Sequence, residues 1–250
     1  ENAPRVLDLS NIQTGKDNPR GWRMVEFPLY QVIGAGLART NANLTIEGWL
    51  RLVTIAASVG TMLLVGLLVA ELVDPMTGLF AAGLFGFLPY SVYYGRTILP
   101  DPFMVFWAVL SIWLAGRGKT MLWTLAAGAA GAFALLAKPM AAFLLVPIPY
   151  LYLRRFGYSR ETVIRLIMYS IVSLLPLFLW RKWILQFPEG IAVNTWLLNG
   201  NGIRFKGAWF YWLFAERLGK LILGYWGLIP LGIGLIVTPS KKEGWVFRWL

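Results

Sequence analysis

Long runs without a charged residue, separated by short polar hinges, constrain this chain more than any other feature. The first run covers residues 52–70, and six more follow it. Of the 250 residues, 58% are hydrophobic and only 14% are charged, whereas a soluble domain of this size carries about 25% charged residues. The excess of apolar side chains has to face lipid. The sequence therefore predicts an all-α polytopic membrane protein.

A transmembrane helix needs about 20 apolar residues at about 1.5 Å each. The chain is expected to hold six spans within residues 51–180 and a seventh within 221–240. An outer loop with an interfacial helix occupies 1–50, and a second outer loop occupies 181–220. Both ends are expected to be cut from a larger protein. The predicted spans are 52–70, 75–95, 102–116, 120–137, 139–153, 166–180 and 221–240.

Two features inside the predicted spans have structural consequences. Pro147 and Pro149 are expected to kink the fifth span. In the fourth span, small residues recur four apart, which lets neighbouring helices approach closely. These pairs are Ala127 with Gly131, and Gly128 with Ala132.

The composition also excludes several kinds of chemistry. The chain has no Cys, so it has no disulfide, thiolate nucleophile or Cys metal site. It has no His, so acid–base or metal chemistry falls to Asp or Glu. The formal net charge of +11 fits anionic lipid or a phosphate-bearing substrate. No nucleic-acid motif is present.

The hinge between the second and third spans holds Arg96 and Asp101, in a region where charge is scarce. A charge beside a membrane span is costly and is usually kept for a function. Asp101 could pair with Arg96. It could equally cap the helix that follows, ahead of Pro102.

Seven spans would place the connections alternately on the two sides of the membrane. The short connections at 117–119 and 154–165 are basic, and the second of them includes Arg165. Their charge predicts that they are cytoplasmic. Residues 1–50, the Arg96–Asp101 hinge, Lys138 and 181–220 would then be extracytoplasmic. We expect the protein to lie in the plasma (inner) membrane, with this face as its active face.

The order of the polar motifs resembles one family, over nearly the whole chain. Residues 26–31, Glu-Phe-Pro-Leu-Tyr-Gln, resemble the "E-x-P-P-L-Y" element of the GT-C membrane glycosyltransferases. The hinge 96–102 is similar to their "R-x-x-x-x-D" motif, and 137–139, Ala-Lys-Pro, to their "K-G" or "K-P" corner. Residues 199–206 and 216–218 resemble their large outer loop. The branch concerned contains the dolichyl-phosphate-mannose–protein mannosyltransferase-like and the lipid A aminoarabinose transferase-like enzymes.

The resemblance implies an inverting glycosyltransferase that moves a sugar from a polyprenyl-phosphate carrier to an acceptor hydroxyl on a glycan, lipid or protein. It also places the usual catalytic carboxylate before Glu1, so this piece alone is expected to be inactive. Leu29 stands where the family has a second proline, which puts the local turn in doubt. The sugar and the acceptor are not specified, and a divalent cation is a possible cofactor.

The candidate site residues each have a simpler structural alternative. Lys138, Arg204, Lys206 and Arg217 are candidate contacts for the donor phosphate. Lys138 could instead snorkel at a helix end, and the other three could be solvated loop or helix-surface charges. Glu26 is a candidate for orienting the acceptor or for binding a divalent metal; alternatively, it only places a charge near a helix start. Arg96 and Asp101 are expected to position other site residues without contacting the substrate themselves.

A transporter or lipid flippase is the alternative from another functional class. Transporters usually place polar or broken helices at the middle of the membrane, often in repeated halves. Here the polar groups collect near one face. A purely structural membrane subunit also fits the composition.

Overall fold

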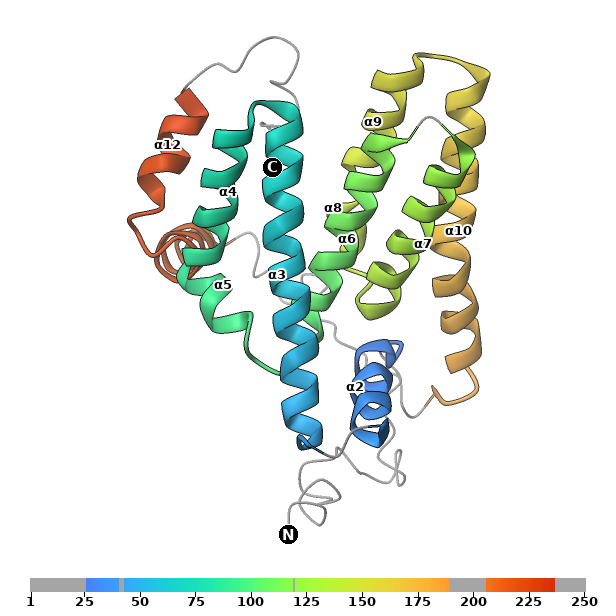
Figure 1. Cartoon of the computed structure of the whole chain (residues 1–250), viewed down its shortest axis with the longest axis horizontal. Coiled ribbons are helices and arrows are strands. Elements are labelled where there is room, and N and C mark those ends of the chain that lie inside the picture. Colours follow the sequence, from blue (N-terminus) through green and yellow to red (C-terminus); the bar gives the residue numbers. More distant parts are fainter. Residues whose placement is uncertain (1–25, 41–42, 119, 189–205, 237–250) are drawn as a thin grey trace.

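The computed structural model describes residues 26–40, 43–118, 120–188 and 206–236, and every regular element in these ranges is helical (Figure 1). Every segment predicted to span the membrane contains helix, which agrees with the all-α prediction. The helices are α2 (Leu29–Thr40), α3 (Ile46–Leu72), α4 (Pro75–Phe87), α5 (Pro89–Tyr94), α6 (Pro100–Arg117), α7 (Met121–Ala137), α8 (Ala141–Leu144), α9 (Pro147–Phe156), α10 (Arg160–Ile184), α11 (Gly207–Tyr211), the π-helix η4 (Trp212–Ile222) and α12 (Leu228–Ile236).

Helix α3 is the central element, and α2, α4 and α6 all pack against it. Its start is fixed by Thr45, whose hydroxyl accepts a hydrogen bond from the Gly48 amide at 3.3 Å. Its buried residues are spaced three or four apart, which puts them on one face. They are Thr54, Ala57, Thr61 and Leu64.

Helices α6, α7 and α10 form a second packed group, in which α7 contacts both of its neighbours. The small residues of α7 allow this close packing, as the sequence predicted. A Cβ atom added to Gly131 would lie 2.7 Å from the Tyr169 hydroxyl, and one added to Gly128 would lie 2.9 Å from Cβ of Val172. Larger residues at these two positions would push α10 away.

Two of the described helices, α3 and α10, are long and apolar enough to cross a membrane. They have 27 and 25 residues, so both extend beyond the predicted runs 52–70 and 166–180. Helices α4 and α7 are apolar but have 13 and 17 residues. The expected total of seven spans therefore stays a prediction.

Prolines divide two of the predicted spans into separate helices, so the prediction of one helix for each of these spans was wrong. The second span was predicted to run unbroken over 75–95. Instead Leu88, with ψ of 131°, ends α4 and Pro89 opens α5. A residue before proline is driven out of the helical region, which explains the break. The fifth span, over 139–153, is not merely kinked: it is split into α8 and α9, with Pro147 opening the second piece.

The boundaries of the second outer loop also differ from the expectation. Helix α10 continues to Ile184, beyond residue 180, and the described end of the predicted loop is helical in α11 and η4. The predicted seventh span over 221–240 is interrupted by a turn in which Gly224 and Tyr225 have positive φ. In Figure 1, η4 is the orange coil beside α5; it is viewed nearly end-on, so its axis runs across that of α3.

Candidate functional site

Three charged residues from distant parts of the sequence meet at one end of the helices. The Lys138 ammonium donates hydrogen bonds to both carboxylate oxygens of Asp101, at 2.9 and 2.8 Å. It also lies 3.8 Å from Oε1 of Glu26. The three side chains are partly exposed, by 26% for Lys138, 29% for Glu26 and 43% for Asp101. We call Glu26, Asp101 and Lys138 the acidic cluster, because their formal charges sum to −1.

Local backbone structure accounts for this meeting. Helices α6 and α7 pack along each other, so the first turn of α6, which carries Asp101, lies beside the end of α7. Lys138 is the C-cap of α7, and its extended backbone precedes Pro139. The segment of Glu26 is tied to the same place, since the Phe27 amide donates to the Leu136 carbonyl at 3.1 Å.

The environment of Glu26 changes its acidity. Partial burial raises the pKa of Glu26 above its ordinary value of 4.5, because the charged form loses contact with water. The positive charge of Lys138 acts in the opposite direction, and the negative charge of Asp101 raises the pKa further. A carboxylate with a raised pKa is a better proton acceptor than an ordinary one.

The predicted partners of Asp101 were wrong. Asp101 pairs with Lys138 rather than with Arg96, which is exposed in the hinge before α6. It also does not cap its helix, since the N-cap of α6 is Leu99 and no side chain caps it. The sequence placed Asp101 and Lys138 on the same side of the membrane but did not pair them.

A pocket of about 560 Å³ lies between α5 and η4. Inside it, the Arg217 guanidinium lies 4.6 Å from the ring centre of Trp212, and the Lys220 ammonium lies 3.7 Å from a carboxylate oxygen of Glu216. We call this the η4 pocket. Its lining residues are Pro89, Tyr90, Tyr93, Trp212, Glu216, Arg217, Lys220 and Leu221.

Tyr90 connects the η4 pocket with the acidic cluster. Its ring packs on Tyr94, with the ring centres 4.3 Å apart. Its hydroxyl lies within electrostatic range of Asp101, Lys138 and Arg217. Charges of both groups therefore act on one common side chain.

One comparison with known proteins decides the family. The sequence model of the dolichyl-phosphate-mannose-protein mannosyltransferase family matches residues 28–158, which is more than half of the chain. The chain belongs to this mannosyltransferase family. It is therefore a glycosyltransferase and an integral membrane protein, as its sequence predicted. No curated protein and no solved structure matches it.

The match covers only part of the mannosyltransferase's candidate site. Asp101, Lys138 and Tyr90 lie inside the matched range, and Glu26 lies two residues before it. The η4 side of the pocket, with Arg217 and Lys220, lies beyond it. The roles of these residues rest on their geometry alone.

The remaining candidate phosphate contacts predicted from the sequence, Arg217, Lys206 and Arg204, lie away from the acidic cluster or outside the described residues. Arg217 lines the η4 pocket, as above. Lys206 is exposed and stands at the N-cap of α11. Arg204 lies outside the residues that the structure describes. Lys220 was missed because 181–220 was predicted to be a loop, in which no helical face is expected. Tyr90 was missed because the aromatic residues at the end of the second predicted span were interpreted as an interfacial group.

The possible metal role of Glu26 has limited support from the described part of the mannosyltransferase. Within the described residues no group of three or more His, Cys, Asp or Glu side chains could hold a metal ion. Glu26 and Asp101 would offer two carboxylates, but Lys138 lies between them. A metal ion at this place would have to displace the ammonium.

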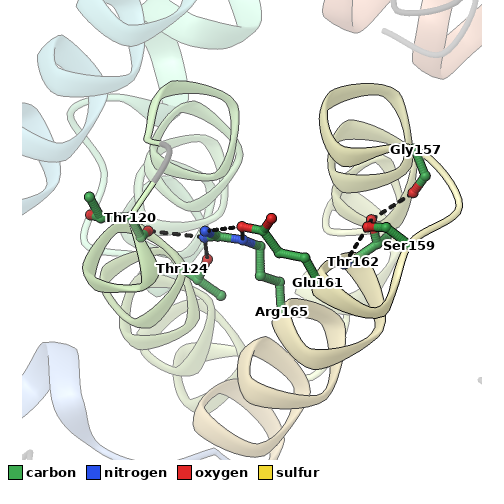
Figure 2. A network of polar contacts seen from close by, with 7 residues as sticks. All are labelled: Thr120, Thr124, Gly157, Ser159, Glu161, Thr162 and Arg165. Atoms are coloured by element: carbon green, nitrogen blue, oxygen red, sulfur yellow. Dashed lines mark hydrogen bonds and ion pairs between the residues drawn. The ribbon is translucent and has the colours of Figure 1, made fainter.

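A different polar network lies at the other end of the helices, around the nearly buried Arg165 (Figure 2). Its guanidinium donates to Oε1 of Glu161 at 3.0 and 2.7 Å, to the Thr120 carbonyl at 3.0 Å and to the Thr124 hydroxyl at 2.8 Å. Its charge also lies 4.3 Å from the ring centre of Phe156. The sequence had assigned Arg165 to a basic loop, whereas it joins α10 to α7.

Proposed function

We propose that this mannosyltransferase transfers mannose from a dolichyl-phosphate-type polyprenyl carrier to an acceptor hydroxyl, at the end of the helices that holds the acidic cluster. Membership of the family supports this class of donor, because the family's name includes dolichyl-phosphate-mannose. The short basic connections at the opposite end favour a cytoplasmic location for that end, so the cluster would face the extracytoplasmic side of the plasma (inner) membrane.

The chemistry requires a proton acceptor close to the acceptor hydroxyl. As the hydroxyl oxygen bonds to the anomeric carbon, the bond from that carbon to the phosphate oxygen breaks, and the phosphate leaves with the electron pair. The hydroxyl proton passes to a carboxylate. Glu26 fits this role, since it is partly buried and has a raised pKa. Inversion follows if the hydroxyl attacks the face opposite the phosphate.

Lys138 and Asp101 support Glu26 in this proposal. The two hydrogen bonds between them fix the ammonium, and the ammonium in turn limits how far the pKa of Glu26 rises. Without a nearby cation, two partly buried carboxylates would repel each other and bind protons more tightly. Arg96, exposed in the neighbouring hinge, would contribute to the positive potential at this end.

The test is a pH–rate profile of the full-length protein, purified and reconstituted in lipid, with radiolabelled dolichyl-phosphate mannose as donor. Because Glu26 must be ionised to accept a proton, the acid limb of kcat/KM should lie above pH 4.5. Glu26→Gln should lower the rate about 100-fold or more and remove that limb. Glu47→Gln is the matched control, since Glu47 is exposed in the first turn of α3.

Two results would count against the proposal. If wild-type protein transfers no mannose from this donor, the donor assignment fails. If wild-type protein is active and Glu26→Gln keeps both the rate and the acid limb, the proton acceptor is another carboxylate, as the sequence resemblance first implied.

A further inference from the structure

We infer that the η4 pocket binds the carrier's phosphate group, with Arg217 and Lys220 as its cations. This inference rests on the proposed function for the identity of the carrier. It assigns the anion to a place other than the acidic cluster, and it adds Lys220 to the residues that the sequence indicated.

The first argument compares the charges of the two places. In the acidic cluster, Lys138 is already bonded to both oxygens of Asp101, and Glu26 leaves a formal charge of −1. A phosphate group arriving there meets net repulsion. In the η4 pocket, Arg217 and Lys220 outweigh Glu216 and leave a formal charge of +1.

The second argument concerns how available these cations are. Lys220 and Glu216 are 62% and 40% exposed, and an exposed ion pair of this kind is weak. A ligand can therefore replace it at low cost. The central carbon of the Arg217 guanidinium lies over the Trp212 ring, 4.6 Å from its centre, and this contact with the ring uses none of its five N–H donors in a hydrogen bond to a carboxylate. A guanidinium suits a phosphate, which Arg can bind through two parallel hydrogen bonds.

The third argument is the π-helical geometry of η4. In an α-helix of 3.6 residues per turn, a side chain five residues further on points about 140° away. In a π-helix the hydrogen bonds run from i to i+5, so residues five apart lie nearly above one another. Trp212 and Arg217, and likewise Glu216 and Leu221, thereby share the pocket face. The unusual helix brings the cation and the aromatic ring onto one surface.

The remaining walls fit the other parts of a lipid-linked sugar phosphate. Pro89, Tyr93 and Leu221 supply apolar and aromatic surface beside the cations. Tyr90 lines the pocket and interacts electrostatically both with Arg217 and with Lys138 of the acidic cluster. The pocket therefore offers apolar and aromatic surface for the rest of the carrier beside the cations that would bind its phosphate.

The experiment measures binding of sugar-free dolichyl phosphate to the full-length protein in nanodiscs of neutral phosphatidylcholine, so that no turnover is needed. Arg217→Gln should weaken binding about ten-fold or more, and Lys220→Gln a few-fold. Arg217→Lys should retain part of the affinity, because it keeps the charge. Arg51→Gln, an exposed arginine of α3, should bind like wild type.

Competition with inorganic phosphate identifies the source of the anion. Failure of inorganic phosphate to displace dolichyl phosphate at equal concentration assigns the pocket to a lipid-linked headgroup; displacement assigns it to phosphate in general.

Wild-type affinity in both Arg217→Gln and Lys220→Gln would overturn the inference, as would loss of binding in Lys138→Met alone. If wild-type protein transfers mannose while these pocket variants bind normally, only the pocket assignment fails. If wild-type protein neither binds the carrier nor transfers mannose, the proposed function fails.

Discussion

Replacing Lys138 tests the acidic cluster most directly, because its ammonium holds both carboxylates. In Lys138→Met the two hydrogen bonds to Asp101, at 2.9 and 2.8 Å, are lost. A hydrogen bond to a charged group contributes about 1.5–3 kcal/mol. Since the lysine side chain is 26% exposed, water replaces part of this interaction, and the lower end of the range applies. A loss of about 1.5 kcal/mol corresponds to roughly a ten-fold lower kcat/KM.

The same substitution has a second effect whose direction follows from charge. Lys138 lowers the pKa of Glu26, so removing it raises that pKa, and the acid limb of kcat/KM should move to higher pH. Asp101 raises the pKa of Glu26, so Asp101→Asn should move the limb to lower pH. Opposite shifts from two neighbouring substitutions are not expected of a purely structural ion pair.

The assay follows mannose transfer from dolichyl-phosphate mannose across a pH series, at saturating acceptor and matched amounts of folded protein. Lys138→Arg is the control, since it keeps the charge while replacing a point cation by a planar fork, and part of the rate should remain. Wild-type rates and an unmoved acid limb in Lys138→Met would refute the reasoning and leave Lys138 as a snorkelling residue.

Two further predictions concern the topology and the packing. Because the chain contains no Cys, Arg96→Cys should react with an impermeant thiol reagent in intact cells, and Tyr158→Cys, 98% exposed at the other end, only after permeabilisation; the reverse pattern would invert the proposed orientation. Gly131→Ala should lower the free energy of unfolding by about 1–3 kcal/mol through its contact with the Tyr169 hydroxyl, whereas Gly83→Ala, with open space around it, should not; equal thermal stability of the two variants would contradict the packing.

The sequence predicted the helical class and the family because both depend on local signals. Uncharged runs reveal apolar helices wherever they occur, and the small residues of α7 indicated close packing before any neighbour was known. The breaks at Pro89 and Pro147 were underestimated from hydrophobic length alone. Pro89 drives Leu88 out of the helical region. Val146 stays helical, but Pro147 has no N–H with which to continue the hydrogen bonds of α8.

The pairing of Asp101 with Lys138 could have been predicted from the sequence, although it was not. Two consecutive antiparallel helices of similar length bring the start of the first beside the end of the second. Helices α6 and α7 have 18 and 17 residues, and these two charges stand at those positions. The place of Glu26 was not predictable in this way, because it depends on the contact between Phe27 and Leu136. The η4 pocket depends on π-helical geometry, which a search for a 3.6-residue period does not detect.

The two ends of the helices use charge differently, and this contrast supports placing the chemistry at the acidic cluster. Arg165 is buried and its guanidinium is satisfied by Glu161, Thr120 and Thr124, which leaves little for a ligand to bind. At the opposite end the acidic cluster keeps an extra negative charge, the η4 pocket keeps an extra positive charge, and both are partly exposed. Charges near a membrane are costly unless they are compensated. A donor that brings an anion to the pocket and an acceptor that gives a proton to the cluster would compensate both at once.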